Sequence, residues 1–146
     1  MVNFKYCVWL VTNNNHIWNK MTNGFIPHIT IKSNLDLSEA VKLYNTLEKK
    51  KYKVILDKIE SINYNDFNSI QYSIFMEGEK MPYWLNEDTH ISFNYRYDKE
   101  YNKEEVELFD KKNKIREAIF NKYMLVRCDG HYKTWKNNII YIDKVD

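Results

Sequence analysis

Two short stretches of this sequence place a histidine two residues before a hydroxyl side chain. His28 precedes Thr30 in the segment PHITIK, and His90 precedes Ser92 in the segment THISFN. Both stretches lie in runs that alternate apolar and polar residues, which is the pattern of a half-buried strand. Because positions i and i+2 of a strand point to the same face, each stretch is expected to present an imidazole and a hydroxyl side by side.

Further polar residues extend these two rows. Lys32 follows on the face of His28, whereas Asn94 and Arg96 follow on the face of His90. The residues expected on the opposite, apolar faces are Ile29, Ile31, Ile91, Phe93, Tyr95 and Tyr97. Each strand then offers an acid–base group, a hydroxyl and a cation on one side and an apolar strip on the other.

Two such rows suit the cleavage of a phosphodiester without a metal. One group must take a proton from the nucleophile and another must give a proton to the leaving oxygen. Imidazole, with an ordinary pKa of about 6.5, can do either near neutral pH. Negative charge builds on the non-bridging oxygens, where hydroxyl donors and cations stabilise it. We therefore expect His28 and His90 to be general acid and base, in an order that the sequence leaves open, and Thr30 and Ser92 to hold the phosphate oxygens.

This doubled motif resembles that of the two-histidine phosphoesterase superfamily. Members of that superfamily include LigT-like RNA 2′,3′-cyclic phosphodiesterases, enzymes that degrade 2′,5′-oligoadenylate, and phage enzymes that cut cyclic oligonucleotide signals. The resemblance covers the order of expected elements over nearly the whole chain, with one departure at Ser92, where threonine is commoner. It implies a metal-independent phosphodiesterase without a cofactor, in which His28, Thr30, His90 and Ser92 form the catalytic site.

Alternation and turn signals along the rest of the chain predict the elements that position these residues. Strands are expected at 4–12, 26–33, 52–62, 69–77, 89–97, 123–128 and 131–142. A capping box between Asp36 and Glu39 predicts a helix to about Lys50, and a charged amphipathic run predicts a second helix at 103–121. The sequence therefore predicts one α+β domain over residues 1–146. It is expected to have two pseudo-symmetric lobes, each an antiparallel sheet with a helix, facing across a central groove.

Aromatic residues in or beside the predicted loops are candidates for stacking on nucleotide bases. Packing in the core is the alternative for each of these rings. The candidate substrate-binding residues are Lys32, Asn94 and Arg96 on the strands and Trp18, Tyr83, Trp84, Tyr132 and Trp135 in or beside loops. The predicted substrate is a nucleotide held by stacking and by local cations.

Composition limits the partners that this chain is expected to bind. A formal charge of +2 over 146 residues gives no broad basic surface of the kind that binds duplex DNA, so a small nucleotide or short oligonucleotide is expected. No apolar run is long enough to predict a membrane span or membrane partner, and a cytoplasmic location is expected. Cys7 and Cys128 each lie in an apolar strand-like run and are expected to be buried free thiols.

No metal site is predicted from the sequence. It contains no His-x-His, Cys-x-x-Cys or His-Glu-x-x-His spacing. His131, after the Asp129-Gly130 turn, is expected either as a hairpin residue or at the edge of the groove. Few glycines and prolines beside many Asn, Lys, Tyr and Ile residues suggest an AT-rich gene, as in large viruses and some bacteria. In a virus, such an enzyme would destroy a cyclic nucleotide defence signal in the host cytoplasm.

Two alternative functions use the same residues. An RNA-end processing or repair phosphodiesterase would need a basic track beyond the groove, for which Arg127, Lys133 and Lys136 are the nearby candidates. A non-catalytic RNA- or nucleotide-binding module would have no need for both histidines and both hydroxyls. Replacing either histidine with alanine separates these classes, because an enzyme should then lose turnover while keeping most of its binding.

Overall fold

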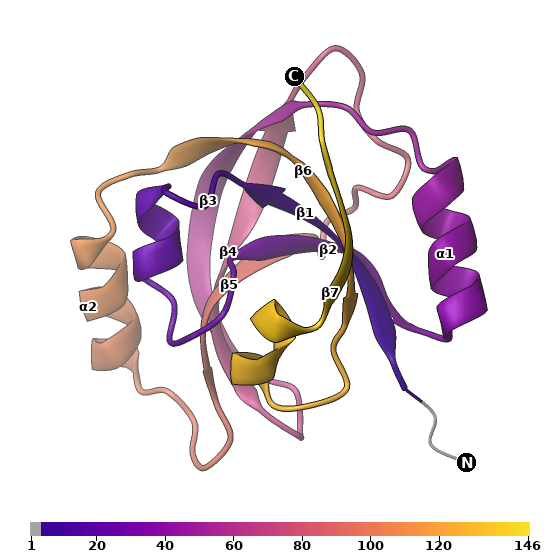
Figure 1. The fold of residues 1–146 in the computed structure, drawn as a ribbon. Coiled ribbons are helices and arrows are strands. Elements are labelled where there is room, and N and C mark those ends of the chain that lie inside the picture. The colour runs from indigo at the N-terminus through magenta and orange to yellow at the C-terminus, as the bar shows by residue number, and fades with distance from the viewer. Residues whose placement is uncertain (1–3) are drawn as a thin grey trace.

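A computed structural model describes residues 4–146 as an α+β fold built mainly of antiparallel strands (Figure 1). The strands are β1 (Tyr6–Thr12), β2 (His28–Leu35), β3 (Tyr52–Asn63), β4 (Asn68–Glu77), β5 (His90–Arg96), β6 (Glu117–Arg127) and β7 (Ile139–Lys144). The helical elements are α1 (Leu37–Thr46), α2 (Lys103–Lys112) and two 3₁₀ segments, η1 (Ile17–Lys20) and η2 (Tyr132–Asn137). The predicted α+β class is confirmed. Residues 1–3 of the predicted domain lie outside the described residues.

Six of the strands close into a barrel. Their hydrogen-bonded order is β1-β2-β5-β4-β3-β6, and β6 pairs back with β1, while β7 is added beside β6. All of these pairings are antiparallel. Closure pairs the backbone groups that an open sheet would leave unpaired at its edges. Both histidine strands lie inside this order, β2 between β1 and β5 and β5 between β2 and β4.

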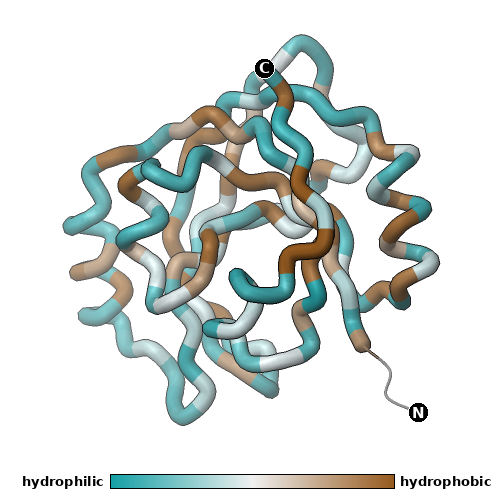
Figure 2. Tube along the Cα trace, viewed as in Figure 1, coloured by the Kyte–Doolittle hydropathy of each residue, from teal (hydrophilic) through white to brown (hydrophobic). Residues whose placement is uncertain are grey.

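The main core lies on one face of these strands and includes side chains from both helices. Leu10 and Ile29 are fully buried there, Tyr44 of α1 belongs to the same cluster, and Phe109 of α2 packs against it. The two helices lie on opposite sides of the strands (Figure 1). Hydrophilic residues dominate the peripheral loops (Figure 2). Although α1 and α2 lie on opposite flanks of the molecule (Figure 1), side chains of both helices pack on the same apolar face of the strands. The histidines lie on the other face.

Helix α1 begins where the sequence predicts. The Asp36 side chain accepts from the Glu39 backbone N–H at 2.8 Å, and Glu39 Oε1 accepts from the Asp36 N–H at 3.2 Å, which completes the capping box. The helix ends at Thr46, earlier than the predicted Lys50, because Leu47 adopts an extended backbone and buries its side chain in the main core.

The second helix is much shorter than predicted. Helix α2 ends at Lys112, and the predicted helix through residue 121 is wrong, because β6 already begins at Glu117. Ala118 and Phe120 are buried while Ile119 is exposed, which is the period of a strand. Pairing with β3 holds these residues in the sheet. Local helical periodicity therefore gave way to long-range strand pairing.

The C-terminal segment is also divided differently from the prediction. One strand was expected over residues 131–142, whereas the 3₁₀ segment η2 precedes β7. His131 caps η2, because its Nδ1 accepts from the Lys133 N–H at 3.2 Å.

Over residues 4–146, no helix is long and apolar enough to cross a membrane.

The two cysteines form a disulfide, so the prediction of free thiols is wrong. Cys7 and Cys128 are joined at 2.03 Å across 121 positions of sequence. The pairing of β1 with β6 places Cys7 opposite Val126, which brings the following Cys128 within reach. Because disulfides persist mainly in oxidising compartments, this bond does not favour the reducing cytoplasm expected from the sequence.

Candidate active site

Strands β2 and β5 lie side by side and bring the two histidine motifs together. They pair antiparallel with Ile29 opposite Ile91, so His28 lies next to Ser92 and Thr30 lies next to His90. Both isoleucines are fully buried in the main core. Since neighbouring residues of a strand alternate faces, the two imidazoles and two hydroxyls belong to the opposite face. All four predicted catalytic residues thus share one face of one strand pair.

Both histidines are held in the same way by the backbone. His28 Nδ1 lies 2.7 Å from the carbonyl oxygen of Ile26, and His90 Nδ1 lies 2.9 Å from that of Asp88. A carbonyl oxygen can only accept, so each Nδ1 carries a proton and donates it. In the neutral ring this leaves each Nε2 unprotonated and able to take a proton from a reactant. A carbonyl two residues upstream therefore sets the same tautomer at both positions.

His28 is enclosed by aromatic rings. Its imidazole stacks on Trp9 with centroids 3.7 Å apart and planes 11° apart, and Phe25 and Trp135 contact it edge-on. The side chain is 6% exposed. The pKa of His28 is lowered to about 4, mainly because burial disfavours the charged imidazolium. The hydrogen bond to the Ile26 carbonyl raises the pKa in part, and the charge of His90 contributes a smaller lowering. His28 is therefore a neutral imidazole at physiological pH.

His90 lies at the rim of the same face. It borders a hollow of about 330 Å³, whose lining includes Thr30, Lys32, Trp84 and Asp88. The ring of Tyr64 lies roughly parallel to its imidazole, with centroids 6.5 Å apart. This hollow collects a hydroxyl, a cation and an imidazole in one open place. It is the part of the site where a phosphate can enter from solvent.

Ser92 is the least accessible of the two hydroxyls. It is 4% exposed and accepts a hydrogen bond from Ser69 Oγ at 3.0 Å. Its neighbour in the pairing is Gln71, whose Oε1 accepts from the Tyr64 hydroxyl at 2.8 Å. Ser92 thus belongs to a buried polar row that joins β4 and β5.

The predicted face of Asn94 and Arg96 is wrong. The β4–β5 register shifts between Ile70 and Gln71, which interrupts the alternation along β5. As a result Tyr95, expected on the apolar face, packs against Phe25 on the side of His28. Asn94 and Arg96 do not continue the row of His90.

Asn94 and Arg96 instead line a separate hollow of about 510 Å³, together with Tyr132, and both side chains make contacts within the protein there. Asn94 Oδ1 accepts from the Tyr101 hydroxyl at 2.6 Å. Arg96 pairs with Glu105 at 2.8 Å, and hydrogen bonding to Arg96 lowers the pKa of Glu105 to about 2. These contacts assign Asn94 and Arg96 to holding the β5–α2 connection.

The predicted stacking rings divide into buried and open ones. Trp18 is fully buried in the main core and donates from Nε1 to the Ile115 carbonyl at 2.9 Å, so it cannot stack on a base. Tyr132 is buried, and Trp135 is half-buried against Trp9. Tyr83 and Trp84 face open space, which makes them the two available rings of the predicted set.

The basic track expected for a longer RNA is only partly present. Arg127 pairs with Asp129 at 2.9 Å, and its guanidinium lies 3.6 Å from the centre of the Phe4 ring. Lys133 and Lys136 are exposed on η2. One of the three predicted cations is therefore already engaged.

Several residues around the site were missed from sequence. Trp9 and Phe25 enclose His28, and Ser69, Gln71 and Tyr64 line the His90 side. A usable signal was the run Asn68 to Ser73, where polar residues alternate within an otherwise apolar strand. Nothing local marks Trp9, because a tryptophan in an apolar strand has the pattern of a core residue.

Within residues 4–146, no group of three or more His, Cys, Asp or Glu side chains is arranged to hold a metal ion. Comparison with models of known protein families finds no match, and comparison with curated protein sequences finds none either. The site's residues and geometry are therefore the basis on which its function is inferred.

Proposed function

We propose that this protein is a metal-independent phosphodiesterase that hydrolyses a small nucleotide phosphodiester. The substrate classes that fit are a cyclic oligonucleotide, a 2′,5′-linked oligonucleotide and a 2′,3′-cyclic phosphate. The observation that carries this proposal is the pairing of Ile29 with Ile91, which sets two backbone-anchored imidazoles and two hydroxyls on one face.

The environments of the two imidazoles support a division of roles. His28 is neutral at physiological pH because burial lowers its pKa, so its Nε2 can take the proton of the attacking water or ribose hydroxyl. His90, at the open rim, takes a proton from solvent onto Nε2 and gives it to the leaving oxygen, and His28 returns its own proton to solvent after turnover. As the new P–O bond forms and the old one breaks, the Thr30 and Ser92 hydroxyls donate to the non-bridging oxygens, and Lys32 adds positive charge.

The strand order supports the two pseudo-symmetric halves expected from the sequence. Exchanging β1 with β4, β2 with β5 and β3 with β6 leaves every pairing of the closed ring unchanged. Helix α1 follows β2 just as α2 follows β5. In this proposal each half supplies one histidine and one hydroxyl, and the groove runs along the β2–β5 pair.

A non-catalytic nucleotide-binding module is the second candidate. The observation that favours it is the enclosure of His28 by Trp9, Phe25 and Trp135, which leaves little surface for a substrate to reach. In such a module the His90 hollow alone would bind the phosphate. The two candidates differ in whether the parent protein turns over a substrate and, if it does, in whether that turnover depends on His28.

An activity panel in the presence of EDTA tests the proposal. The substrates are 2′,3′-cyclic AMP, 2′,5′-diadenylate, cyclic di- and trinucleotides, and a short RNA ending in a 2′,3′-cyclic phosphate. His28→Ala and His90→Ala are each expected to lower the rate by about 10²–10⁴, because each removes one proton-transfer group. Ser38→Ala, on the exposed surface of α1, is the control and should match the parent protein.

Folding of each variant is checked by its thermal midpoint before rates are compared. Cleavage that survives both histidine substitutions, or no cleavage of any substrate by the parent protein, would reject the catalytic role. Binding of a substrate by the parent protein without turnover would then favour the binding module.

A further inference from the structure

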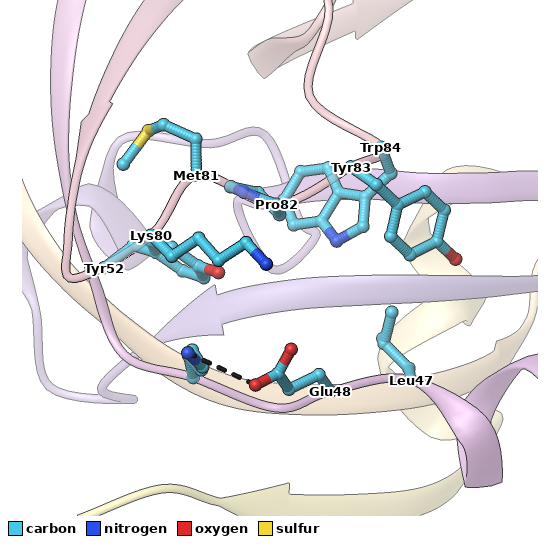
Figure 3. A pocket seen from close by; sticks show the side chains of 9 residues that line it. Leu47, Glu48, Tyr52, Lys80, Met81, Pro82, Tyr83 and Trp84 are labelled. Carbon is cyan, nitrogen blue, oxygen red and sulfur yellow. Dashed lines mark ion pairs between the residues drawn. The ribbon is translucent and has the colours of Figure 1, made fainter.

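A second hollow lies between the end of α1, the start of β3 and the loop that connects β4 to β5. Its volume is about 310 Å³, and its walls include Leu47, Tyr52, Lys80, Tyr83 and Trp84. Figure 3 shows the Lys80 side chain reaching across the hollow between the rings of Tyr52 and Trp84. We call this hollow the Trp84 pocket.

The walls of the Trp84 pocket combine aromatic surface with a free cation. Tyr83 is 78% exposed and Met81 is 42% exposed, which leaves apolar surface in contact with water beside the half-buried Trp84. Lys80 forms no ion pair with any residue in the range 4–146, whereas Glu48 pairs with Lys50 at 3.2 Å, which the dashed line in Figure 3 marks. Aromatic faces beside an unpaired ammonium fit a base and its phosphate.

Trp84 also lines the hollow that contains Thr30, Lys32 and His90. The two hollows therefore share Trp84 as a lining residue. A ligand with a phosphate at His90 can extend past Trp84 into the second hollow. A ligand with a single nucleotide has no group to place there.

We infer that the Trp84 pocket binds the second nucleotide of the substrate. Its base lies against Trp84 and Tyr83, and its phosphate meets Lys80. This inference rests on the proposed function for its first subsite, the phosphate at His90. It selects substrates of two or more nucleotides, linear or cyclic, over a nucleoside 2′,3′-cyclic phosphate.

The test measures binding separately from turnover. Calorimetric titrations of 5′-phosphorylated 2′,5′-diadenylate, cyclic di-AMP and 2′,3′-cyclic AMP are made on the His90→Ala protein, which consumes the ligands much more slowly under the proposed mechanism. The same titrations are repeated with Lys80→Met and Tyr83→Ala added together. The added changes should reduce the preference for a dinucleotide over 2′,3′-cyclic AMP by about tenfold, within the range measured for loss of base stacking.

Lys112→Met, on the exposed surface of α2, is the matched control for removal of a lysine charge and should leave that preference unchanged. The inference is overturned if no dinucleotide binds, or if the added changes weaken the mononucleotide and dinucleotides equally. The activity panel is a separate readout. If the parent protein cleaves dinucleotides and Lys80→Met with Tyr83→Ala does not change that rate, the Trp84 pocket is rejected as a subsite while the proposed enzyme activity stands. If dinucleotide binding depends on Lys80 and Tyr83 but no substrate is cleaved, the pocket stands while the proposed enzyme activity is rejected.

Discussion

The two histidine strands place the same motif in two different environments. The register sets Leu10 opposite Ile29 on one side of the pair and Tyr72 opposite Ile91 on the other. By the same register, Trp9 lies opposite Thr30 and Gln71 lies opposite Ser92. These two residues therefore hold corresponding positions beside the two histidine strands.

The side chains of Trp9 and Gln71 give the two histidines different access to water. Trp9 stacks directly on His28 and excludes water from it. Gln71 instead accepts a hydrogen bond from Tyr64, which keeps the His90 side polar. Two imidazoles with the same Nδ1 hydrogen bond thus lie in different environments, and the side chain at this position contributes to the difference.

Replacing these equivalent residues gives the largest expected effect. Trp9→Ala should lower the free energy of unfolding by about 4 kcal/mol, because it removes a fully packed ring from the core. Gln71→Ala should cost about 1 kcal/mol, the typical value for one hydrogen bond. Urea unfolding followed by circular dichroism measures both, and equal losses would contradict the comparison.

The disulfide fastens only the enclosed half of the site. It ties β1, which carries Trp9, to the turn that leads into η2 and Trp135. The Cys7→Ser/Cys128→Ser variant should lose about 3 kcal/mol of stability, since a long loop is no longer closed in the unfolded chain. Hydrogen exchange should increase in η2 more than in the loop before His90. Equal increases at both places would show that the disulfide does not act on the enclosed half alone.

Stability should also depend on pH through His28. The unfolded chain protonates this residue near its ordinary value of 6.5, whereas the folded protein does so only near pH 4. The unfolded state therefore binds the extra proton between these values, and stability falls as the pH is lowered through this window, by about 3 kcal/mol. In His28→Gln this component should be absent. Parallel stability curves for parent and variant from pH 7 to pH 4 would contradict the enclosed, neutral His28.

A kinetic form of the same comparison uses the acidic limb of the pH–rate profile. If His28 is the base, kcat/KM should hold on the acidic side until the pH approaches about 4, because the base stays unprotonated above its lowered pKa. Trp9→Gln, which opens that side to water, should move this limb to higher pH. If the acidic limb of the folded Trp9→Gln variant lies at the same pH as that of the parent protein, Trp9 does not set the pKa of His28.

The sequence was sufficient where the signal was local. The capping box at Asp36 and Glu39 and the alternation in both histidine strands correctly predicted the start of α1 and the course of β2 and β5. The repetition of the motif predicted that both copies line one groove between two facing sheets, whereas in the structure the two strands that carry them pair directly.

The errors all involve partners far away in the chain. Residues 117–121 pair with β3, Cys7 meets Cys128 across the barrel, and the register shift opposite Gln71 displaces Asn94 and Arg96 from the His90 row. The enclosure of His28 has the same origin, since Trp9 and Trp135 come from opposite ends of the sequence. Periodicity cannot report such contacts, because they depend on which strands become neighbours.

The six-stranded ring fixes the relative position of the two histidines, whereas part of the cover over His28 comes from outside the ring. Both histidines stand on strands whose neighbours are fixed on each side, so their relative position cannot change without breaking the ladder. Trp135, on η2, lies outside that ring. The part of the enclosure of His28 that Trp135 supplies therefore comes from outside the strand ladder that aligns the two histidines.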